Sequence, residues 1–241
     1  MKLLQLNAWG GKLGWQIIDL VKAEQPDIIC LQEVNDIDGP RDYLFASLDD
    51  IAEAAGLGLG YRYMSPVDRS RYQKRWLAYG NAILSREPLQ DTETIFTLGQ
   101  LNDDFDLALE ADKESRNLQH VRLASGLHVF NHHGLFVPEG KNGNAETDRQ
   151  MGLVYDQIAA AQGPVIFCGD LNLAPTTPAV QRFSKLLTNL SADLGSTYNW
   201  LSIHKVVCDY IMTSSEVRVQ RFAMLDAVVS DHNPLILEFD L

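Results

Sequence analysis

The chain has 241 residues, a formal net charge of −12 and a hydrophobic fraction of 46%. This acidity disfavours a protein whose main task is to grip long duplex DNA without sequence preference, because such affinity comes from neutralising phosphates. The sequence contains no apolar stretch that could span a bilayer, and no linker, low-complexity tract or short repeat. We therefore expect a single domain over residues 1–241, without stable membrane insertion.

Short apolar runs bounded by turn-forming residues predict buried strands, and apolar residues at helical spacing predict helices. In chain order, strands are expected at residues 2–7, 28–33, 59–65, 80–85, 92–97, 117–124, 127–132, 164–168, 205–213, 217–225 and 234–239. Helices are expected at residues 14–25, 41–55, 146–161 and 177–188; Leu44 belongs to the apolar face of the second. Strands that are apolar on both faces predict sheets covered by helices, an α/β fold.

Five of the apolar runs end in a cluster of Asp, Glu, Asn or His. These runs cover residues 3–7, 28–33, 129–133, 165–172 and 228–234. Carboxylates and imidazoles are costly to bury unpaired, so they belong at strand ends or in loops. Five such ends predict a common mouth where hard oxygen ligands and histidines converge, which suits a divalent metal and phosphate ester chemistry.

Taken in order, the motifs at these ends resemble those of the endonuclease/exonuclease/phosphatase superfamily. The matching segments are 6–9 (LNAW), 31–34 (LQEV), 79–86 (YGNAILSR), 131–133 (NHH), 169–172 (GDLN), 208–211 (CDYI) and 230–234 (SDHNP). The resemblance implies a four-layer sandwich of two stacked mixed β-sheets flanked by helices. It also implies hydrolysis of a phosphate ester by in-line attack of an activated water, with Mg²⁺ as cofactor and Mn²⁺ as an alternative.

The resemblance assigns the metal to three residues. Glu33 is implied to be the main ligand, Asn7 to touch the metal or its water, and Asp231 to bind directly or through water. Carboxylate and amide oxygens are the donors that magnesium prefers. From the residues alone, the alternatives are a strand-end acid facing solvent for Glu33 and a turn former for Asn7.

The remaining motifs supply the catalytic groups. In an extended segment Asp170 and Asn172 share a face. The resemblance implies that Asp170 orients or deprotonates the attacking water and that Asn172 holds a phosphate oxygen. An Asp/Asn turn is the alternative. Of the adjacent pair His132 and His133, the resemblance selects His133 as the phosphate-contacting or acid histidine.

His232 needs an orienting partner, because its neighbour Asp231 is assigned to the metal. Asp209 lies in an otherwise apolar strand, where an unpaired carboxylate would be expensive, so we predict an Asp209–His232 pair. The resemblance adds that His232 binds the scissile phosphate. The alternative for Asp209 is a buried cap or salt bridge.

Further residues are candidates for holding the substrate. The resemblance suggests Asn81 and, loosely, Arg116. A basic segment at residues 67–77, which includes Arg71 and Lys74, reads either as a loop that binds extra phosphates or as a solvated surface. The acidic loop at residues 103–114 would repel nucleic acid if it faced the same mouth. We read His120, His128 and His204 as surface or core residues.

The substrate is left open at this stage. We favour a phosphodiester, with nucleic acid or a nucleotide among the candidates; the alternatives are a phosphomonoesterase for a small metabolite or lipid headgroup and, remotely, a non-catalytic binding module on the same fold. Cys30, Cys168 and Cys208 lie inside apolar runs, which predicts reduced core thiols and a cytoplasmic setting. We expect a monomer.

Overall fold

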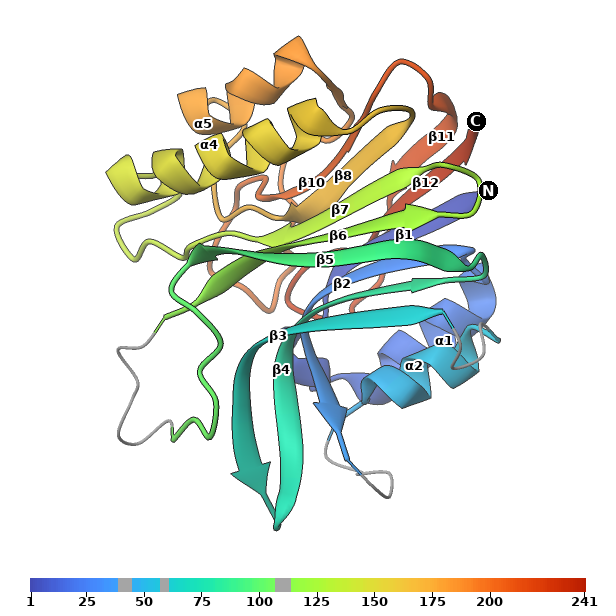
Figure 1. Ribbon diagram of the computed structural model, residues 1–241, viewed down its shortest axis with the longest axis vertical. Coiled ribbons are helices and arrows are strands. Elements are labelled where there is room, and N and C mark those ends of the chain that lie inside the picture. The colour runs from blue at the N-terminus through green and yellow to red at the C-terminus, as the bar shows by residue number, and fades with distance from the viewer. Residues whose placement is uncertain (39–44, 57–60, 107–113) are drawn as a thin grey trace.

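Two six-stranded β-sheets stack face to face, and helices cover the outer face of each (Figure 1). The computed structural model describes residues 1–38, 45–56, 61–106 and 114–241. This four-layer arrangement confirms the α/β sandwich predicted from the sequence. Part of the expected helix at 41–55, including Leu44, part of the expected strand at 59–65 and most of the acidic loop lie outside the described residues.

The first sheet combines both ends of the chain. Its strand order is β11 (Arg218–Met224), β12 (Leu235–Asp240), β1 (Lys2–Asn7), β2 (Ile28–Ile37), β4 (Arg75–Ser85) and β3 (Arg62–Tyr72). Only β1 and β2 pair in parallel, with Leu3 opposite Ile28 and Asn7 opposite Gln32. The carboxyl ends of these two strands therefore lie side by side.

The second sheet is built the same way from the middle of the chain. Its order is β5 (Leu89–Leu98), β6 (Arg116–Leu123), β7 (His128–His133), β8 (Val165–Asp170), β10 (Asp209–Thr213) and β9 (Thr188–Asn189). Its one parallel pair is β7 and β8, which sets His133 opposite Asp170. The antiparallel strand β10 sets Asp209 opposite Asp170 from the other side.

Helices close the two outer faces. The helical segments are η1 (Trp9–Gly11), α1 (Gly14–Glu24), α2 (Leu48–Ala54), α4 (Ala145–Ala160), α5 (Pro178–Gln181) and η2 (Arg182–Lys185). Helices α1 and α2 cover the first sheet, and α4 and α5 cover the second (Figure 1). Ser47 and Asn144 each begin a helix with a reciprocal capping box, which satisfies backbone N–H groups that the first turn leaves unpaired.

One predicted loop is a hairpin. Residues 67–77 fall in β3 and β4, which pair from Arg62 opposite Leu84 to Tyr72 opposite Arg75 and project beyond the sandwich (Figure 1). The turn is tight because Gln73 and Lys74 both adopt positive φ, which reverses the chain in two residues. The prediction of a loop was wrong because its closely spaced charges hid the strand alternation.

Candidate active site

The period-two alternation of strands explains why polar residues meet between the sheets. In β1, Leu4 and Leu6 pack toward the helices, whereas Leu3 belongs to the core between the sheets. Gln5 and Asn7 share the inner face with Leu3. The other strands repeat this order, with apolar residues first and polar residues at the end: Ile28, Cys30 and Gln32; Val129, Asn131 and His133; Ile166, Cys168 and Asp170. The inner core is therefore apolar at one end and polar at the other.

Glu33 breaks the alternation and still reaches this mouth. As the residue after the inward Gln32, it would point toward the helices in a regular strand. A bulge interrupts the pairing of β2 with β4 between Leu31 and Val34, and Glu33 adopts a φ of 52°. Bulges re-aim side chains in this way beside active sites. Glu33 accepts a hydrogen bond from Asn7 Nδ2 at 3.1 Å and lies 3.8 Å from Nε2 of His133.

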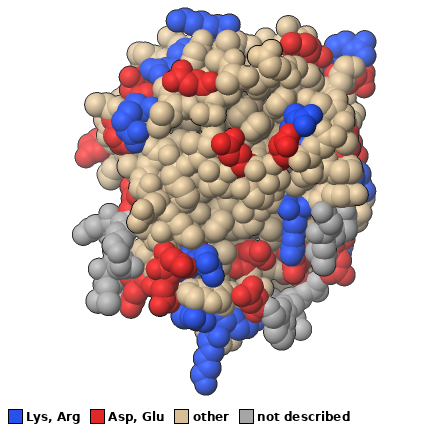
Figure 2. Space-filling view, viewed as in Figure 1, with Lys and Arg blue, Asp and Glu red and all other residues tan. Residues whose placement is uncertain are grey.

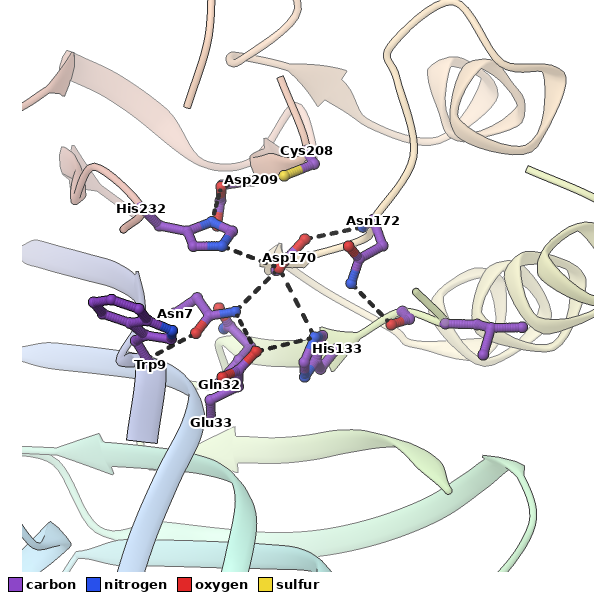
Figure 3. A network of polar contacts seen from close by, with 12 residues as sticks. Asn7, Trp9, Gln32, Glu33, His133, Asp170, Asn172, Cys208, Asp209 and His232 are labelled. Carbon is purple, nitrogen blue, oxygen red and sulfur yellow. Dashed lines mark hydrogen bonds and ion pairs between the residues drawn. The ribbon is translucent and has the colours of Figure 1, made fainter. Parts of the chain in front are cut away.

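Asp170 is the centre of the polar network (Figure 3). It is buried at the end of β8; Oδ1 accepts the backbone N–H of Asn172 at 2.9 Å and Oδ2 accepts Asn7 Nδ2 at 3.1 Å. Nε2 of His232 and Nε2 of His133 lie 3.7 and 3.8 Å from Oδ2. Burial and the negative charge of Asp209 raise the pKa of Asp170. A carboxylate whose pKa is raised toward neutrality is a stronger base for a water molecule.

The Asp209–His232 pair predicted from the sequence is present. His232 Nδ1–H donates to Oδ2 of Asp209 at 2.7 Å, and the Asp209 side chain is fully buried. Burial disfavours the imidazolium, but the charges of Asp209 and Asp170 and the Asp209 hydrogen bond outweigh it and raise the pKa of His232 to about 10. In the metal-free site His232 is therefore a cation at neutral pH, with Nε2 turned toward Asp170.

His133 has the opposite electrostatic character. Burial and the positive charge of Arg116 lower its pKa well below the ordinary value. A neutral imidazole can donate a hydrogen bond from its one N–H to a phosphate oxygen, but it lacks the acidic imidazolium proton that a general acid transfers to a leaving group. His132 points to the other face of β7, where its Nδ1 lies 2.9 Å from the carbonyl oxygen of Asn117. The two adjacent histidines thus point to opposite faces of the strand, as successive residues of a strand do.

A chain of buried amides supports Asp209 from behind. Gln5 Nε2 donates to Asp209 Oδ1 at 3.2 Å and to Gln32 Oε1 at 2.9 Å. Gln32 Nε2 donates to Asn131 Oδ1 at 2.6 Å, and Asn131 Nδ2 donates to Gln119 Oε1 at 3.2 Å. All of these side chains are fully buried between the sheets. Among the described residues, Gln5 Oε1 is buried without a hydrogen-bond partner, but the bonds given above still fix the side-chain positions, so the network holds Asp209 in place for His232.

The network opens into a cavity of about 310 Å³ between the sheet ends. Three carboxylates, Glu33, Asp170 and Asp231, line it together with His133 and His232. Such a concentration of acid is costly without a cation, and a hard divalent ion bound by oxygens would offset it. The donor set at this mouth therefore fits magnesium or manganese.

Asn7 presents an unexpected atom to this site. Its Nδ2 points at Glu33 and Asp170, whereas its Oδ1 accepts the backbone N–H of Trp9 at 3.0 Å. The amide therefore bridges two carboxylates as a donor in this arrangement. To bind an ion through Oδ1, as the sequence predicts, Asn7 would have to rotate and give up the Trp9 contact.

A second group of ligand atoms lies deeper in the site. Asp170, Cys208 and His232 each bring one potential ligand atom within 4.8 Å of the others. Burial and the charges of Asp170 and Asp209 raise the pKa of the Cys208 thiol well above its ordinary value. Since thiols bind metals as thiolates, this group is a poorer site than the oxygen donors of Glu33 and Asp231.

The predicted substrate residues divide into two sets. Asn81 and Arg116 line the cavity; Arg116 is fixed by carbonyl oxygens of Gly134 and Ser115 and by Glu114 at 2.5 Å. Arg71 and Lys74 belong instead to the projecting hairpin and are not among the described residues that line this cavity.

Acidic neighbours offset much of the hairpin's positive charge. Arg71 lies 3.5 Å from the ring centroid of Trp76 and 3.9 Å from Asp104, and Arg69 lies 3.4 Å from Asp103. Figure 2 shows the basic atoms of this end next to acidic ones. Asp103 and Asp104, at the start of the acidic loop, therefore lie beside the basic hairpin and neutralise part of its charge.

Several residues of the site were missed from the sequence. Tyr79 and Tyr198 line the cavity; the Tyr79 hydroxyl hydrogen-bonds Glu33, and the Tyr198 ring lies 4.3 Å from that of His232. His204, read as a surface or core residue, also lines it. Lys141 is buried behind Asn172 and bonds its Oδ1. Tyr79 lies within a matched motif and was detectable; Lys141 lies in a loop without any periodic signal.

The chain belongs to the Endonuclease/Exonuclease/phosphatase family, whose model matches residues 4–232. Members of this family are hydrolases of phosphate esters and typically depend on a divalent metal. A comparison with curated protein sequences finds no match.

Solved structures show the same fold at low sequence identity. An endonuclease/exonuclease/phosphatase from Beutenbergia cavernae is 18% identical, with a TM-score of 0.70, over 100% of this chain and 71% of the other. A mannosyl-6-phosphatase from Bacteroides thetaiotaomicron is 17% identical, with a TM-score of 0.68, over 100% of both chains. The human Nocturnin catalytic domain, with bound sulfate, is 21% identical, with a TM-score of 0.66, over 100% of this chain and 93% of the other. These likenesses establish the fold and leave the substrate open.

Across the described residues, no helix has the length and apolar character needed to cross a membrane.

Proposed function

We propose that this protein hydrolyses a phosphate ester with the help of magnesium, and that a phosphodiester is its preferred substrate. The observation that carries the proposal is the convergence of Glu33, Asp170, His133 and the Asp209–His232 pair on one cavity. A non-catalytic binding module would not need a buried Asp–His pair beside a carboxylate whose pKa is raised.

Glu33 and Asp231, with Asn7 after reorientation, would hold the ion. When bound, the ion supplies charge neutralisation at the phosphoryl oxygens. Asp170 orients the attacking water and accepts its proton, in keeping with its raised pKa. His232, held by Asp209, donates from Nε2 to a phosphoryl oxygen and offsets the charge that develops there. Asn172 and His133 each have an N–H donor available for the remaining oxygens.

The walls of the cavity support a diester. A diester carries an organic group on each side of phosphorus, and Trp9 lies among the lining residues together with Phe136 and Tyr198. These rings could pack against sugars or bases on both sides of the phosphate. Asn81 and Arg116 would help to hold the substrate from β4 and β6.

A phosphomonoesterase for a small metabolite is the second candidate. The cavity of about 310 Å³ suits a small ester rather than a polymer, and a mannosyl-6-phosphatase is among the structurally similar proteins. The experiment that separates the candidates is an assay with magnesium on matched substrates: 4-nitrophenyl phosphate, bis(4-nitrophenyl) phosphate, linear and cyclic dinucleotides, and single-stranded DNA. Hydrolysis of the diesters supports the proposal, and hydrolysis of the monoester alone would replace it with the second candidate.

We also propose that residues 1–241 form one domain, that the protein is a monomer and that it works in the cytoplasm. The core between the sheets joins strands from both ends of the chain to strands from its middle, which supports a single domain. Cys30, Cys168 and Cys208 are free and fully buried, which supports a reducing compartment. Gel filtration would test the monomer.

A further inference from the structure

Lys141 is a buried cation beside the candidate active site. It lies in the loop between β7 and α4 and is only 7% exposed. Its Nζ donates to Oδ1 of Asn172. The same Nζ lies 4.5 Å from the ring centroid of Phe136 and 5.7 Å from that of Tyr198. All three contacted residues line the catalytic cavity, so the ammonium stands directly behind the cavity wall.

This charge is poorly compensated by the protein. Burying an ammonium is expensive unless a carboxylate pairs with it. Among the residues that the structure describes, Lys141 has no ion-pair partner, only one amide oxygen and two ring faces. Two cations that line the cavity do have acidic partners: Arg116 is held by Glu114 and His232 by Asp209. A folded protein that retains such a charge gains little stability from it, which suggests that a ligand uses it.

Lys141 also fixes the orientation of the Asn172 amide. A lysine ammonium can only donate hydrogen bonds, so Oδ1 of Asn172 must face Lys141. The Nδ2 group is then turned the other way, where one hydrogen bonds the carbonyl oxygen of Gly134 at 3.1 Å. The other Nδ2 hydrogen remains for an acceptor in the cavity. Without Lys141 only the Gly134 carbonyl would hold the amide in this orientation, and a reversed amide would present an oxygen that repels a phosphate.

The field of Lys141 reaches the groups around it. Burial lowers the pKa of His204, and the charge of Lys141 lowers it further. The pKa of Asp170 is raised by burial and by Asp209, and the charge of Lys141 opposes that rise, so Asp170 offsets part of the Lys141 charge. The carboxylates Glu33 and Asp231 contribute further negative charge to the same cavity. The cavity is therefore polar, with a cation-accepting part and an anion-accepting part.

We propose that Lys141 is a positioning residue that makes the Asn172 part of the cavity a subsite for a phosphoryl oxyanion. It does so by turning Nδ2 of Asn172 toward the anion and by placing behind it a positive charge that has no ion-pair partner among the described residues. The proposal rests on the function proposed above, but it concerns anion binding and needs no turnover to be tested.

The test measures binding of inorganic phosphate to the full chain in EDTA by isothermal titration calorimetry. Lys141→Met should weaken phosphate binding about tenfold or more, by loss of one charge and of the fixed amide. Lys141→Arg, which keeps the charge and donates only, should restore part of the affinity. Lys22→Met, on the exposed side of α1, changes the net charge equally and should bind phosphate like the unaltered protein.

Thermal unfolding separates this role from a structural one. Removing this poorly compensated buried charge should leave the melting temperature of Lys141→Met unchanged or raise it. Undiminished phosphate binding by Lys141→Met, or an unaltered protein that binds no phosphate, would overturn the proposal. A lower melting temperature of Lys141→Met, together with phosphate binding by Lys141→Arg that is as weak as that by Lys141→Met, would also overturn it. If every ester in the panel resists hydrolysis while Lys141→Met still loses phosphate binding, the proposed function fails and the role of Lys141 stands.

Discussion

Replacing Asp209 by Asn removes one charge from the centre of the site and preserves its shape. The carboxylate accepts from His232 at 2.7 Å and from Gln5 at 3.2 Å, and it is fully buried. A hydrogen bond to a charged group contributes about 1.5–3 kcal/mol, and about 1.4 kcal/mol corresponds to a tenfold change in rate. If the imidazolium of His232 stabilises the transition state, turnover should therefore fall about tenfold to a hundredfold.

The pH dependence of turnover tests the same prediction in a second, independent way. Burial disfavours the imidazolium, and Asp209 is the largest of the charges that oppose it and raise the pKa of His232 to about 10. In Asp209→Asn that pKa should fall, so the alkaline limb of the pH–rate profile should move to lower pH. Steady-state kinetics across pH 6 to 10, with magnesium held constant, measures both effects. Turnover like that of the unaltered protein with an unmoved limb would show that Asp209 does not serve His232.

The same pair should influence stability in the absence of metal. The folded pKa of about 10 exceeds the ordinary value of 6.5, so the contribution of His232 is fully present below about pH 6.5 and is lost as pH rises toward 10. Urea unfolding in EDTA should therefore show stability falling between pH 7 and 10, and falling less in Asp209→Asn. Equal slopes would contradict the assignment.

The remaining predictions concern the metal, the amide network and the hairpin. EDTA should abolish activity, and Glu33→Gln should raise the magnesium concentration for half-maximal activity about tenfold or more; an unchanged requirement would mean that another residue is the main ligand. Asn131→Leu should lower the free energy of unfolding by about 2–5 kcal/mol in urea titrations, because it leaves buried partners without hydrogen bonds. A loss below about 1 kcal/mol would contradict the network's role. Replacing Arg71, Lys74 and Arg75 together by Gln should leave small-ester hydrolysis intact, since the hairpin lies outside the cavity wall; a loss confined to longer substrates would assign the hairpin to them.

Much of the fold was predictable because its strands are short apolar runs with clear ends. The strands of each parallel pair, β1–β2 and β7–β8, are joined through a helix, α1 and α4 respectively, that the sequence patterns indicate. The polar residues at the strand ends were predictable for the same reason, since water or a ligand must satisfy them. The pairing of Asp209 with His232 followed from the cost of burying Asp209 alone, and the structure has that pair.

Other features depend on backbone irregularities and loops, which leave little periodic trace. The direction of Glu33 depends on a bulge and a positive φ, neither of which its neighbours in sequence reveal. The hairpin at residues 67–77 was hidden by its charges, and cross-strand and ring contacts stabilise it instead. Lys141 reaches Asn172 because the backbone of its loop binds the segment after β8, where Ala174 N–H donates to the Lys141 carbonyl at 2.7 Å.

The position of Asp209 beside Asp170 shows why strand register decides the chemistry. The two carboxylates are cross-strand partners in β8 and β10, although 38 residues separate them along the chain. A shift of one residue in this antiparallel pair would turn Asp209 toward the helices and bring Tyr210 to the inner face. Tyr210 is anchored on the helix side by its hydroxyl, which donates to the carbonyl of Leu173 at 2.7 Å, and Ile211 is packed between the sheets. The apolar and aromatic residues that follow Asp209 therefore fix the register, and the register in turn sets the distance between Asp170, the proposed base, and the carboxylate that holds His232.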